Sequence, residues 1–211
     1  MRKIAYLYVC DTMADWEPSY VISELHSGRY FKDKTLKYEV KTVSLTQDPI
    51  TTMGGVKILP DLTVHQLSVH EAGILILPGG DTWLEPLHTP VFNSVREFLH
   101  AHIPVAAICG ATIGLAAHGF LNDRQHTSND CEYLKAVCPS YKGESFYLQQ
   151  PAVMDGDLIT ASGVAPLDFA YAILNKLEVY RPETLEAWYK LYQTYEATYF
   201  FALMASLPQV A

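Results

Sequence analysis

Residues 103–119 read IPVAAICGATIGLAAHG, and this stretch predicts a buried strand that turns directly into a helix. The strand, Val105–Cys109, is short and apolar, as buried parallel strands tend to be. The helix that follows is built of small and apolar residues, and Gly119 is suited to its C-terminus. Cys109 is therefore predicted to lie in the turn between the strand and the helix.

A cysteine in such a turn has the setting of a reactive thiol. Gly110 and Ala111 are small enough to let a strained turn approach the sheet closely. The unpaired N–H groups and the dipole of the helix N-terminus stabilise a thiolate, so we expect the pKa of Cys109 to be lowered. A buried structural cysteine at a strand end is the alternative interpretation.

The same alternation of strand and helix extends along most of the chain. It predicts a doubly wound α/β fold with a mostly parallel central sheet, in which ligands bind beyond the carboxyl ends of the strands. Residues 51–60 and 150–157 each have the pattern of a hairpin. The predicted strands are Ile4–Cys10, Tyr38–Leu45, Gly73–Leu77 and Val105–Cys109, and the predicted helices include Glu17–His26 and Val91–His102.

The segment from Pro182 to Leu207 differs from the rest of the chain. Aromatic and leucine side chains recur there at intervals of three and four residues, which predicts one stripe on a helix or a helix pair. We favour packing of this stripe against the domain, with a lid or a dimer contact as the alternative. The expected organisation is an α/β domain over residues 1–180 and a helical extension over residues 181–211.

Composition narrows the class of protein further. The 211 residues carry 15 Lys+Arg and 23 Asp+Glu, a formal net charge of −8, which argues against nucleic acid as a partner. No apolar run approaches the roughly 18 residues that a membrane span requires. The four cysteines form no CxxC pair and have no histidines at zinc-site spacing, so we expect no metal and no disulfide. A cytoplasmic protein that acts on a small molecule is the expectation.

A second strand end lies at residues 74–81, where an apolar run meets Pro78-Gly79-Gly80-Asp81. A Gly-Gly turn lets backbone N–H groups face the neighbouring strand end. The amides of Gly80 and Gly110 would together form an oxyanion hole for a tetrahedral intermediate at Cys109. Most Gly-Gly pairs are only turns, which is the alternative here.

These residues together resemble the ThiJ/PfpI family of the class I glutamine amidotransferase-like superfamily. The matching segments keep the family's order over about residues 2–178, and it is their combination that is specific. They are Ile76-Leu77-Pro78-Gly79-Gly80, Ala106-Ala107-Ile108-Cys109-Gly110, Glu17 after the first strand, Asp157-Leu158-Ile159-Thr160-Ala161-Ser162-Gly163, and a helix over Ala165–Leu177.

The resemblance implies a flavodoxin-like sandwich and usually a homodimer. We expect no cofactor. By position, Cys109 would be the nucleophile or redox-sensing thiol, and Glu17 the carboxyl group beside it. Gly80 and Gly110 would supply the oxyanion amides. Because a carboxylate would repel a thiolate, we expect Glu17 to be protonated and to donate to the sulfur.

One feature departs from the family's pattern. Enzymes of the family commonly carry a histidine beside the cysteine or at the end of the next strand, and the first of these positions is Gly110 here. Matching Thr127-Ser128 to the family's small-hydroxyl pair puts Asn129 at the second position, and an amide is no general base. His126 is three residues away and points to the opposite face of a regular strand, so it would serve only if the strand bulges.

Three functions are compatible with these residues. The first is a cysteine-dependent hydrolase or amidotransferase-like enzyme, with a peptidase, an amidase and a glyoxalase-like or deglycase-like enzyme as forms of it. The second is a non-enzymatic oxidative-stress sensor or chaperone that uses the same thiol, which requires no general base. The third is a catalytically silent binding module that retains the turn for folding.

Overall fold

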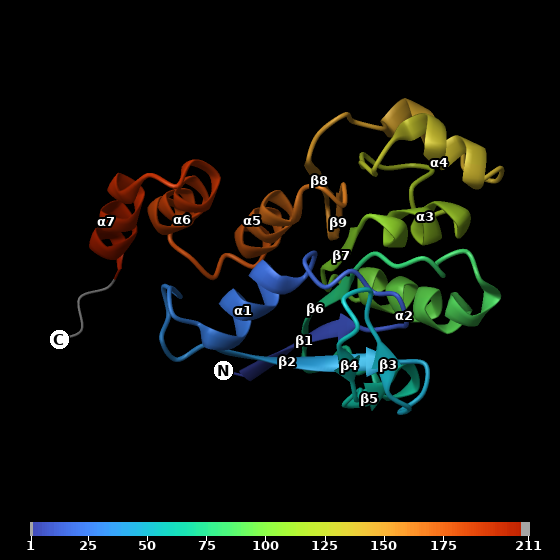
Figure 1. Cartoon of the computed structure of the whole chain (residues 1–211), viewed down its shortest axis with the longest axis horizontal. Coiled ribbons are helices and arrows are strands. Elements are labelled where there is room, and N and C mark those ends of the chain that lie inside the picture. The colour runs from blue at the N-terminus through green and yellow to red at the C-terminus, as the bar shows by residue number, and fades with distance from the viewer. Residues whose placement is uncertain (1, 208–211) are drawn as a thin grey trace.

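The computed structural model describes residues 2–207, and its centre is a seven-stranded sheet (Figure 1). Six strands run parallel, and β8 at one edge is antiparallel to β9. The order β2-β1-β6-β7-β9 within the sheet is that of a flavodoxin-like fold, so the predicted fold class is confirmed. The strands are β1 Arg2–Tyr8, β2 Lys37–Ser44, β5 Leu62–Thr63, β6 Ala72–Leu77, β7 Val105–Ile108, β8 Ala152–Asp155 and β9 Leu158–Ala161.

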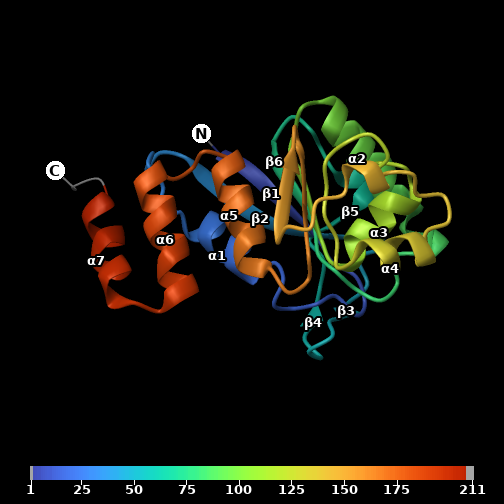
Figure 2. The ribbon, with the colours of Figure 1, turned by 90° about the horizontal axis from the view of Figure 1, so that it is seen from above.

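Helices cover both faces of this sheet (Figure 2). Helices α1 and α5 lie on one face, and α2 and α3 lie on the other with α4 beside them. The helices are α1 Ser19–Ser27, α2 Thr89–His100, α3 Gly110–Ala117, α4 Cys131–Val137 and α5 Pro166–Lys176, with short 3-10 turns at Val64–Gln66, Pro86–His88 and Glu144–Phe146.

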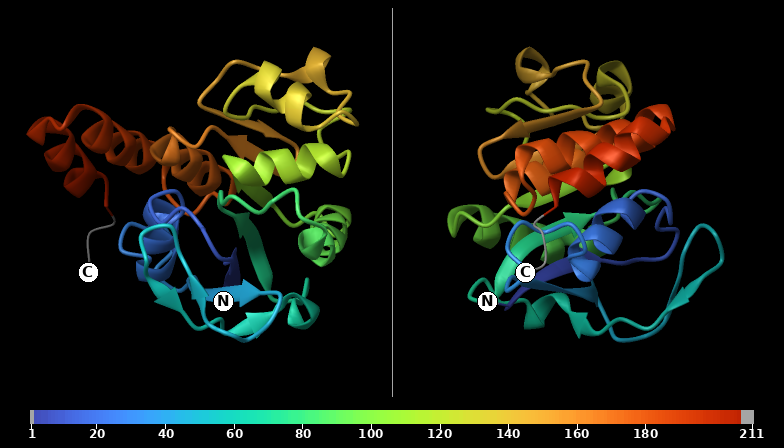
Figure 3. Two further views of the ribbon diagram at one scale, coloured as in Figure 1. Left: turned by 45° about the vertical axis from the view of Figure 1, so that its right-hand side comes forward. Right: turned by 90° about the vertical axis from the view of Figure 1, so that its left-hand side faces the viewer.

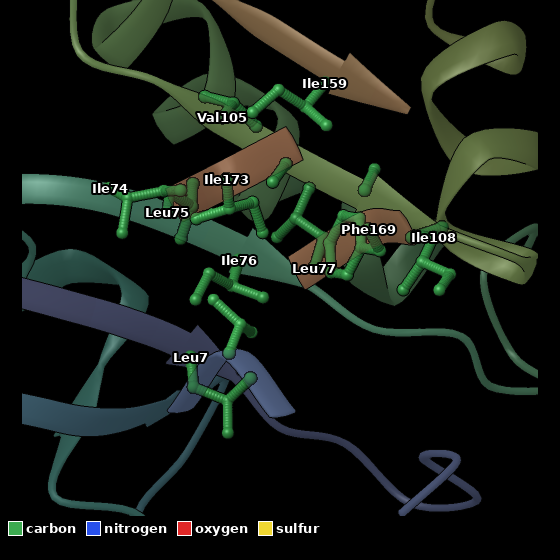
Figure 4. Close-up of a cluster of buried hydrophobic side chains, with 14 of the residues drawn as sticks. Leu7, Ile74, Leu75, Ile76, Leu77, Val105, Ile108, Ile159, Phe169 and Ile173 are labelled. Carbon is green, nitrogen blue, oxygen red and sulfur yellow. The ribbon is translucent and has the colours of Figure 1, made fainter. Parts of the chain in front are cut away.

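Two-sided coverage explains why the central strands are continuously apolar. All six residues of β6 are buried, because its side chains meet helices on either face of the sheet. Figure 4 shows Phe169 and Ile173 of α5 packed against Leu75 and neighbouring strand residues. This core fixes the strand ends, and the loops that follow them, relative to one another.

The predicted hairpins are both present. Ile50–Thr51 (β3) pairs antiparallel with Lys57–Ile58 (β4), and β8 pairs with β9 through a turn at Gly156. Gly156 has φ +60°, a conformation that glycine adopts without strain.

The start of α1 differs from the sequence prediction. The helix begins at Ser19, with Pro18 as its N-cap residue, and Glu17 lies in the preceding turn. A residue directly before proline is disfavoured in helical geometry because the proline ring crowds its backbone. Glu17 therefore belongs to the loop between β1 and α1 and not to the helix.

The C-terminal segment forms two helices, α6 Pro182–Thr194 and α7 Ala197–Ser206, which extend in a row from α5 (Figures 1 and 3). The predicted stripe is divided between them. Trp188 and Leu203 are buried, whereas Tyr195 ends α6 in left-handed geometry and is exposed. The division at residues 180 and 181 remains a prediction, and residues 208–211 of that extension lie outside the described part.

A buried carboxylate joins this extension to α1. Glu24 accepts hydrogen bonds from Arg29, from the hydroxyl of Tyr180 at 2.7 Å and from the indole of Trp188 at 3.0 Å. Its side chain is almost fully buried, and every donor comes from a different part of the chain. The packing interpretation of the aromatic segment therefore accounts for α6, while α7 packs mainly on α6. No helix within residues 2–207 is long and apolar enough to cross a bilayer.

Candidate active site

The carboxyl ends of β1, β6, β7 and β9 meet at one edge of the sheet, and the predicted site residues gather there. Cys109 follows β7, and Glu17 lies in the loop after β1. Gly80 follows β6, and Gly163 follows β9. The parallel register of these strands brings together residues that are far apart in the sequence.

Cys109 occupies a strained turn. It has φ +58° and ψ −124°, and it is the N-cap residue of α3. A non-glycine residue with positive φ costs free energy, so the surrounding packing must hold it in place. Its N–H continues the sheet ladder by donating to Ala161 O at 3.0 Å. The side chain is consequently directed out of the sheet edge toward Glu17 and Asn129.

Two glycines from other strands make room for this side chain. A Cβ atom at Gly163 would lie 2.7 Å from Cys109 Sγ, and one at Gly79 would lie 2.8 Å from Cys109 Cβ. Neither approach is compatible with a larger residue unless the site moves. Gly163 fits the family's pattern in the sequence, but this role has no local signal because the contact joins residues 54 positions apart.

Glu17 is held by the turn after β6. Its Oε2 accepts a hydrogen bond from the N–H of Gly79, and the side chain is fully buried. Its Oε1 is buried without a nitrogen or oxygen donor among residues 2–207. That atom lies 3.1 Å from the point where a Gly163 Cβ would be, beside the thiol of Cys109. The thiol is the group that this oxygen faces.

Asn129 contacts the sulfur from the other side. Its Nδ2 lies 3.3 Å from Cys109 Sγ, and its Oδ1 accepts from the N–H of Gly163 at 2.8 Å. The second contact fixes the orientation of the amide, because of its two terminal atoms only the oxygen accepts a hydrogen bond. Asn129 is thus oriented to donate to the sulfur.

A model of the DJ-1/PfpI family matches residues 2–176. The chain belongs to this family. Over 206 residues it is 50% identical to a Bacillus subtilis (strain 168) protein named uncharacterized protease YoaZ, covering 98% of each chain. It is 35% identical over 187 residues to uncharacterized protease YdeA of the same organism, covering 88% of each. A ThiJ/PfpI family protein from Bacillus anthracis has a crystal structure that matches with a TM-score of 0.94 and 49% identity, covering 98% of each chain. The family lies in the class I glutamine amidotransferase-like superfamily.

His126 precedes Asn129 by three residues, but its side chain does not contact Cys109. His126 is fully buried, with Nδ1 on the carbonyl of Arg124 at 2.8 Å and Nε2 on the hydroxyl of Tyr141 at 2.7 Å. Burial lowers the pKa of this imidazole, which keeps it neutral. Its nitrogens are therefore engaged away from Cys109, and the side chain next to the sulfur at that position is Asn129.

The pKa of the Cys109 thiol is raised, which corrects the expectation that it is lowered. Burial raises the pKa of the Cys109 thiol, and the negative charge of Glu17 raises it further, although donation from Asn129 opposes both. The predicted lowering of the thiol pKa rests on the helix N-terminus, whereas burial has the larger effect. Burial likewise raises the pKa of Glu17, against the hydrogen bond from Gly79. Each group thus favours its protonated form.

The two amides predicted as an oxyanion hole lie next to each other. A Cβ at Gly110 would lie 3.2 Å from Gly80 N and 2.5 Å from Gly80 O, so the two turns touch. The N–H of Gly79 is already bound to Glu17. The backbone N–H of Gly110 lowers the pKa of the Cys109 thiol, against the larger effect of burial. Their use as an oxyanion hole remains a prediction.

The other thiols lack this setting. Burial raises the pKa of Cys10 to about 12, and Cys138 is buried as well. Cys131 begins α4 and is partly exposed. Within residues 2–207 no group of three His, Cys, Asp or Glu side chains could hold a metal ion.

Proposed function

We propose that the protein is a cysteine-dependent hydrolase that cleaves an amide or ester bond of a small peptide-like substrate. One observation carries this proposal: Glu17 Oε1 is buried, lacks a nitrogen or oxygen donor among the described residues, and faces the thiol of Cys109. Once Glu17 has lost its own proton, this desolvated oxygen beside the thiol is placed to take the thiol proton. The names of the Bacillus subtilis relatives are consistent with such an activity.

In the first step, the carboxylate of Glu17 accepts the thiol proton while Sγ forms a bond to the carbonyl carbon of the substrate. The carbonyl oxygen gains the electron pair of its π bond and becomes the oxyanion. The N–H groups of Gly110 and Gly80 would stabilise that negative charge, an effect that commonly contributes about 3 kcal/mol. Asn129 Nδ2 holds the sulfur in place.

The carboxyl group of Glu17 then returns its proton to the leaving amine or alkoxide as the bond to the carbonyl carbon breaks. This leaves a thioester on Cys109. In the second half, Glu17 takes a proton from water as the hydroxyl attacks the thioester. The carbon–sulfur bond breaks, the acid departs, and the proton restores the thiol. Glu17 thus serves in place of the absent histidine.

The proton inventory predicts the pH profile. The active form carries one proton on the Cys109–Glu17 pair, so kcat/KM rises with pH as the pair loses its first proton and falls as it loses its second. Because burial raises the pKa of both groups, both limbs should lie above the ordinary values of a carboxyl group and a thiol.

The decisive experiment compares p-nitrophenyl acetate hydrolysis by Cys109→Ser, Glu17→Gln and Cys131→Ser variants. We expect Cys109→Ser to be inactive and Glu17→Gln to lose about 10²–10⁴-fold in kcat/KM. Cys131→Ser, which removes a partly exposed thiol elsewhere, should retain activity. The proposal is wrong if Cys109→Ser hydrolyses the ester as fast as the unmodified protein does.

The oxidative-stress sensor remains the second candidate, because Asn129 Nδ2 and the Gly110 amide would also bind the oxygens of a sulfinate. Two equivalents of hydrogen peroxide would oxidise Cys109 to that state and be reduced to water. The raised thiol pKa works against this reaction, which requires a thiolate. Selective oxidation of Cys109 at low peroxide, without any ester turnover, would favour the sensor. The homodimer, the small-molecule substrate and the cytoplasmic location remain predictions.

A further inference from the structure

An open, mostly apolar depression lies beside the loop that carries Glu17. Its volume is about 510 Å³. Trp16 directly precedes Glu17, and the hairpin β3–β4 supplies the opposite wall with Met53 and Val56. The lining residues are Asp15, Trp16, Ser19, Met53, Gly54 and Val56.

Trp16 connects this depression to the nucleophile. Its indole N–H donates to the carbonyl of Gly163 at 3.3 Å. Gly163 in turn approaches Cys109 Sγ closely and donates to Asn129. The depression is therefore linked to the nucleophile through Gly163, which contacts both Trp16 and Cys109.

The hairpin wall is firmly attached. Figure 2 shows β3 and β4 beyond the end of the central sheet, next to the loop that precedes α1. Thr12 N donates to Thr51 O at 3.0 Å, and Met53 N donates to Met13 O at 2.9 Å. The carboxylate of Asp15 accepts from Gly54 N at 2.7 Å. The wall is consequently a preformed surface, held by the same loop that carries Glu17.

The walls expose apolar side chains that a folded protein would otherwise bury. Trp16 is 50% exposed, Met53 48% and Val56 56%, and they come from two separate segments. Clusters of this kind on a surface indicate binding, because apolar groups gain free energy when a ligand covers them.

The charge of the depression defines which ligand fits. Asp15 is the charged residue of the lining, and its hydrogen bonds with Thr52 and Gly54 lower its carboxyl pKa and keep it ionised. Its negative charge would repel an acidic side chain, and the remaining lining offers no cation to bind one. The apolar walls instead suit a neutral hydrophobic side chain.

We infer that this depression binds the apolar side chain of the residue whose carbonyl Cys109 attacks, and that it makes the enzyme selective for such residues. The inference rests on the proposed function, since it uses the same thiol and the same carbonyl. Its occupant is a leucine-like side chain of a peptide substrate.

Peptide aldehydes test the inference without an unknown substrate. Each aldehyde adds the Cys109 sulfur to its carbonyl carbon, and the thiol proton passes to the carbonyl oxygen to give a hemithioacetal. N-acetyl-leucinal, N-acetyl-glycinal and N-acetyl-aspartal differ only in the side chain. We expect the leucine aldehyde to inhibit p-nitrophenyl acetate hydrolysis about tenfold or more tightly than the glycine one, and the aspartate aldehyde to be the weakest.

Variants of the hairpin wall locate the preference. Met53→Ser and Val56→Ser should each reduce the ratio between leucine and glycine aldehydes severalfold. Leu59→Ser, which removes an exposed apolar side chain just after β4 and outside the depression, should leave the ratio unchanged. Circular dichroism of each variant is the control that checks its folding.

The outcomes distinguish a failure of this inference from a failure of the proposed hydrolase function. Equal inhibition by leucine and glycine aldehydes, with hydrolysis still dependent on Cys109, overturns the subsite and leaves the hydrolase intact. Hydrolysis that is independent of Cys109 overturns the hydrolase. If Val56→Ser converts a dimer into a monomer in light scattering without changing the inhibition ratio, the depression is a contact between two copies and the inference is wrong.

Discussion

Two buried glutamates lie seven residues apart, and their surroundings are opposite. Glu24 in α1 accepts from Arg29, Tyr180 and Trp188, so both its oxygens are occupied. Glu17, in the loop before α1, accepts from Gly79 on one oxygen and faces Cys109 with the other. A saturated carboxylate stabilises packing, while an unsaturated one beside a thiol can exchange a proton. Both side chains are buried, so their hydrogen bonding is what distinguishes the structural Glu24 from Glu17, the candidate proton acceptor.

The largest loss of stability should follow from removing the Glu24 side chain. Glu24→Ala leaves the Tyr180 hydroxyl and the Trp188 indole without their acceptor and removes the partner of Arg29. Because Arg29 is about half exposed, water compensates part of the loss. We expect the free energy of unfolding to fall by about 3 kcal/mol in urea denaturation.

The control for this change is Glu97→Ala on the exposed side of α2, which should alter the free energy of unfolding by less than about 0.5 kcal/mol. The folded Glu24→Ala protein should retain the pH dependence of Cys109 alkylation. A shifted thiol pKa in this variant would show that the two glutamates do not act separately.

A smaller loss should come from filling the space around the thiol. Gly163→Ala places a Cβ 2.7 Å from Cys109 Sγ and 3.1 Å from Glu17 Oε1, so the nucleophile must move. Overpacking of this kind costs about 1–3 kcal/mol in the free energy of unfolding. Differential scanning calorimetry and alkylation of Cys109 by iodoacetamide measure the two consequences.

Gly80→Ala is the matched control at the same edge of the sheet, because the nearest atoms to its added Cβ would be 3.5 Å away. We expect it to lower stability less than Gly163→Ala does, and to leave alkylation of Cys109 nearly unchanged. Equal losses in the two variants would contradict the close approach at Gly163.

The sequence could predict the turn at Cys109 but not the contacts that surround it. Strand, small residues and helix are local in residues 103–119, so Cys109 was placed correctly in the turn. The predicted helix start at Glu17 was wrong, because Pro18 is the N-cap residue and excludes Glu17 from the helix. The burial of Glu24 had no local signal, since its donors lie up to 164 residues away. For the same reason the predicted lowering of the Cys109 pKa rests on the helix N-terminus and omits the burial of the thiol, which comes from residues far apart in the sequence.

The smallest change in stability should come from Glu17→Gln, and its sign depends on pH. Burial raises the pKa of Glu17 in the folded state, so the folded protein holds this proton to higher pH than the unfolded chain does. The stability contributed by the protonated form is fully present below the unfolded pKa of about 4.3 and is lost as pH rises through the folded pKa. Relative to the unmodified protein, Glu17→Gln should therefore gain stability above that range, by about 1 kcal/mol or less.

The same variant sharpens the assignment of Glu17 as a proton carrier. Glutamine removes the negative charge that raises the pKa of Cys109 and presents an N–H donor to the sulfur, so the thiol pKa should fall. Alkylation at neutral pH should consequently be faster while ester hydrolysis is slower, because a more abundant thiolate has lost its proton partner. If hydrolysis instead rises together with alkylation, Glu17 acts only through its charge, and water alone moves the protons in the reaction of Cys109.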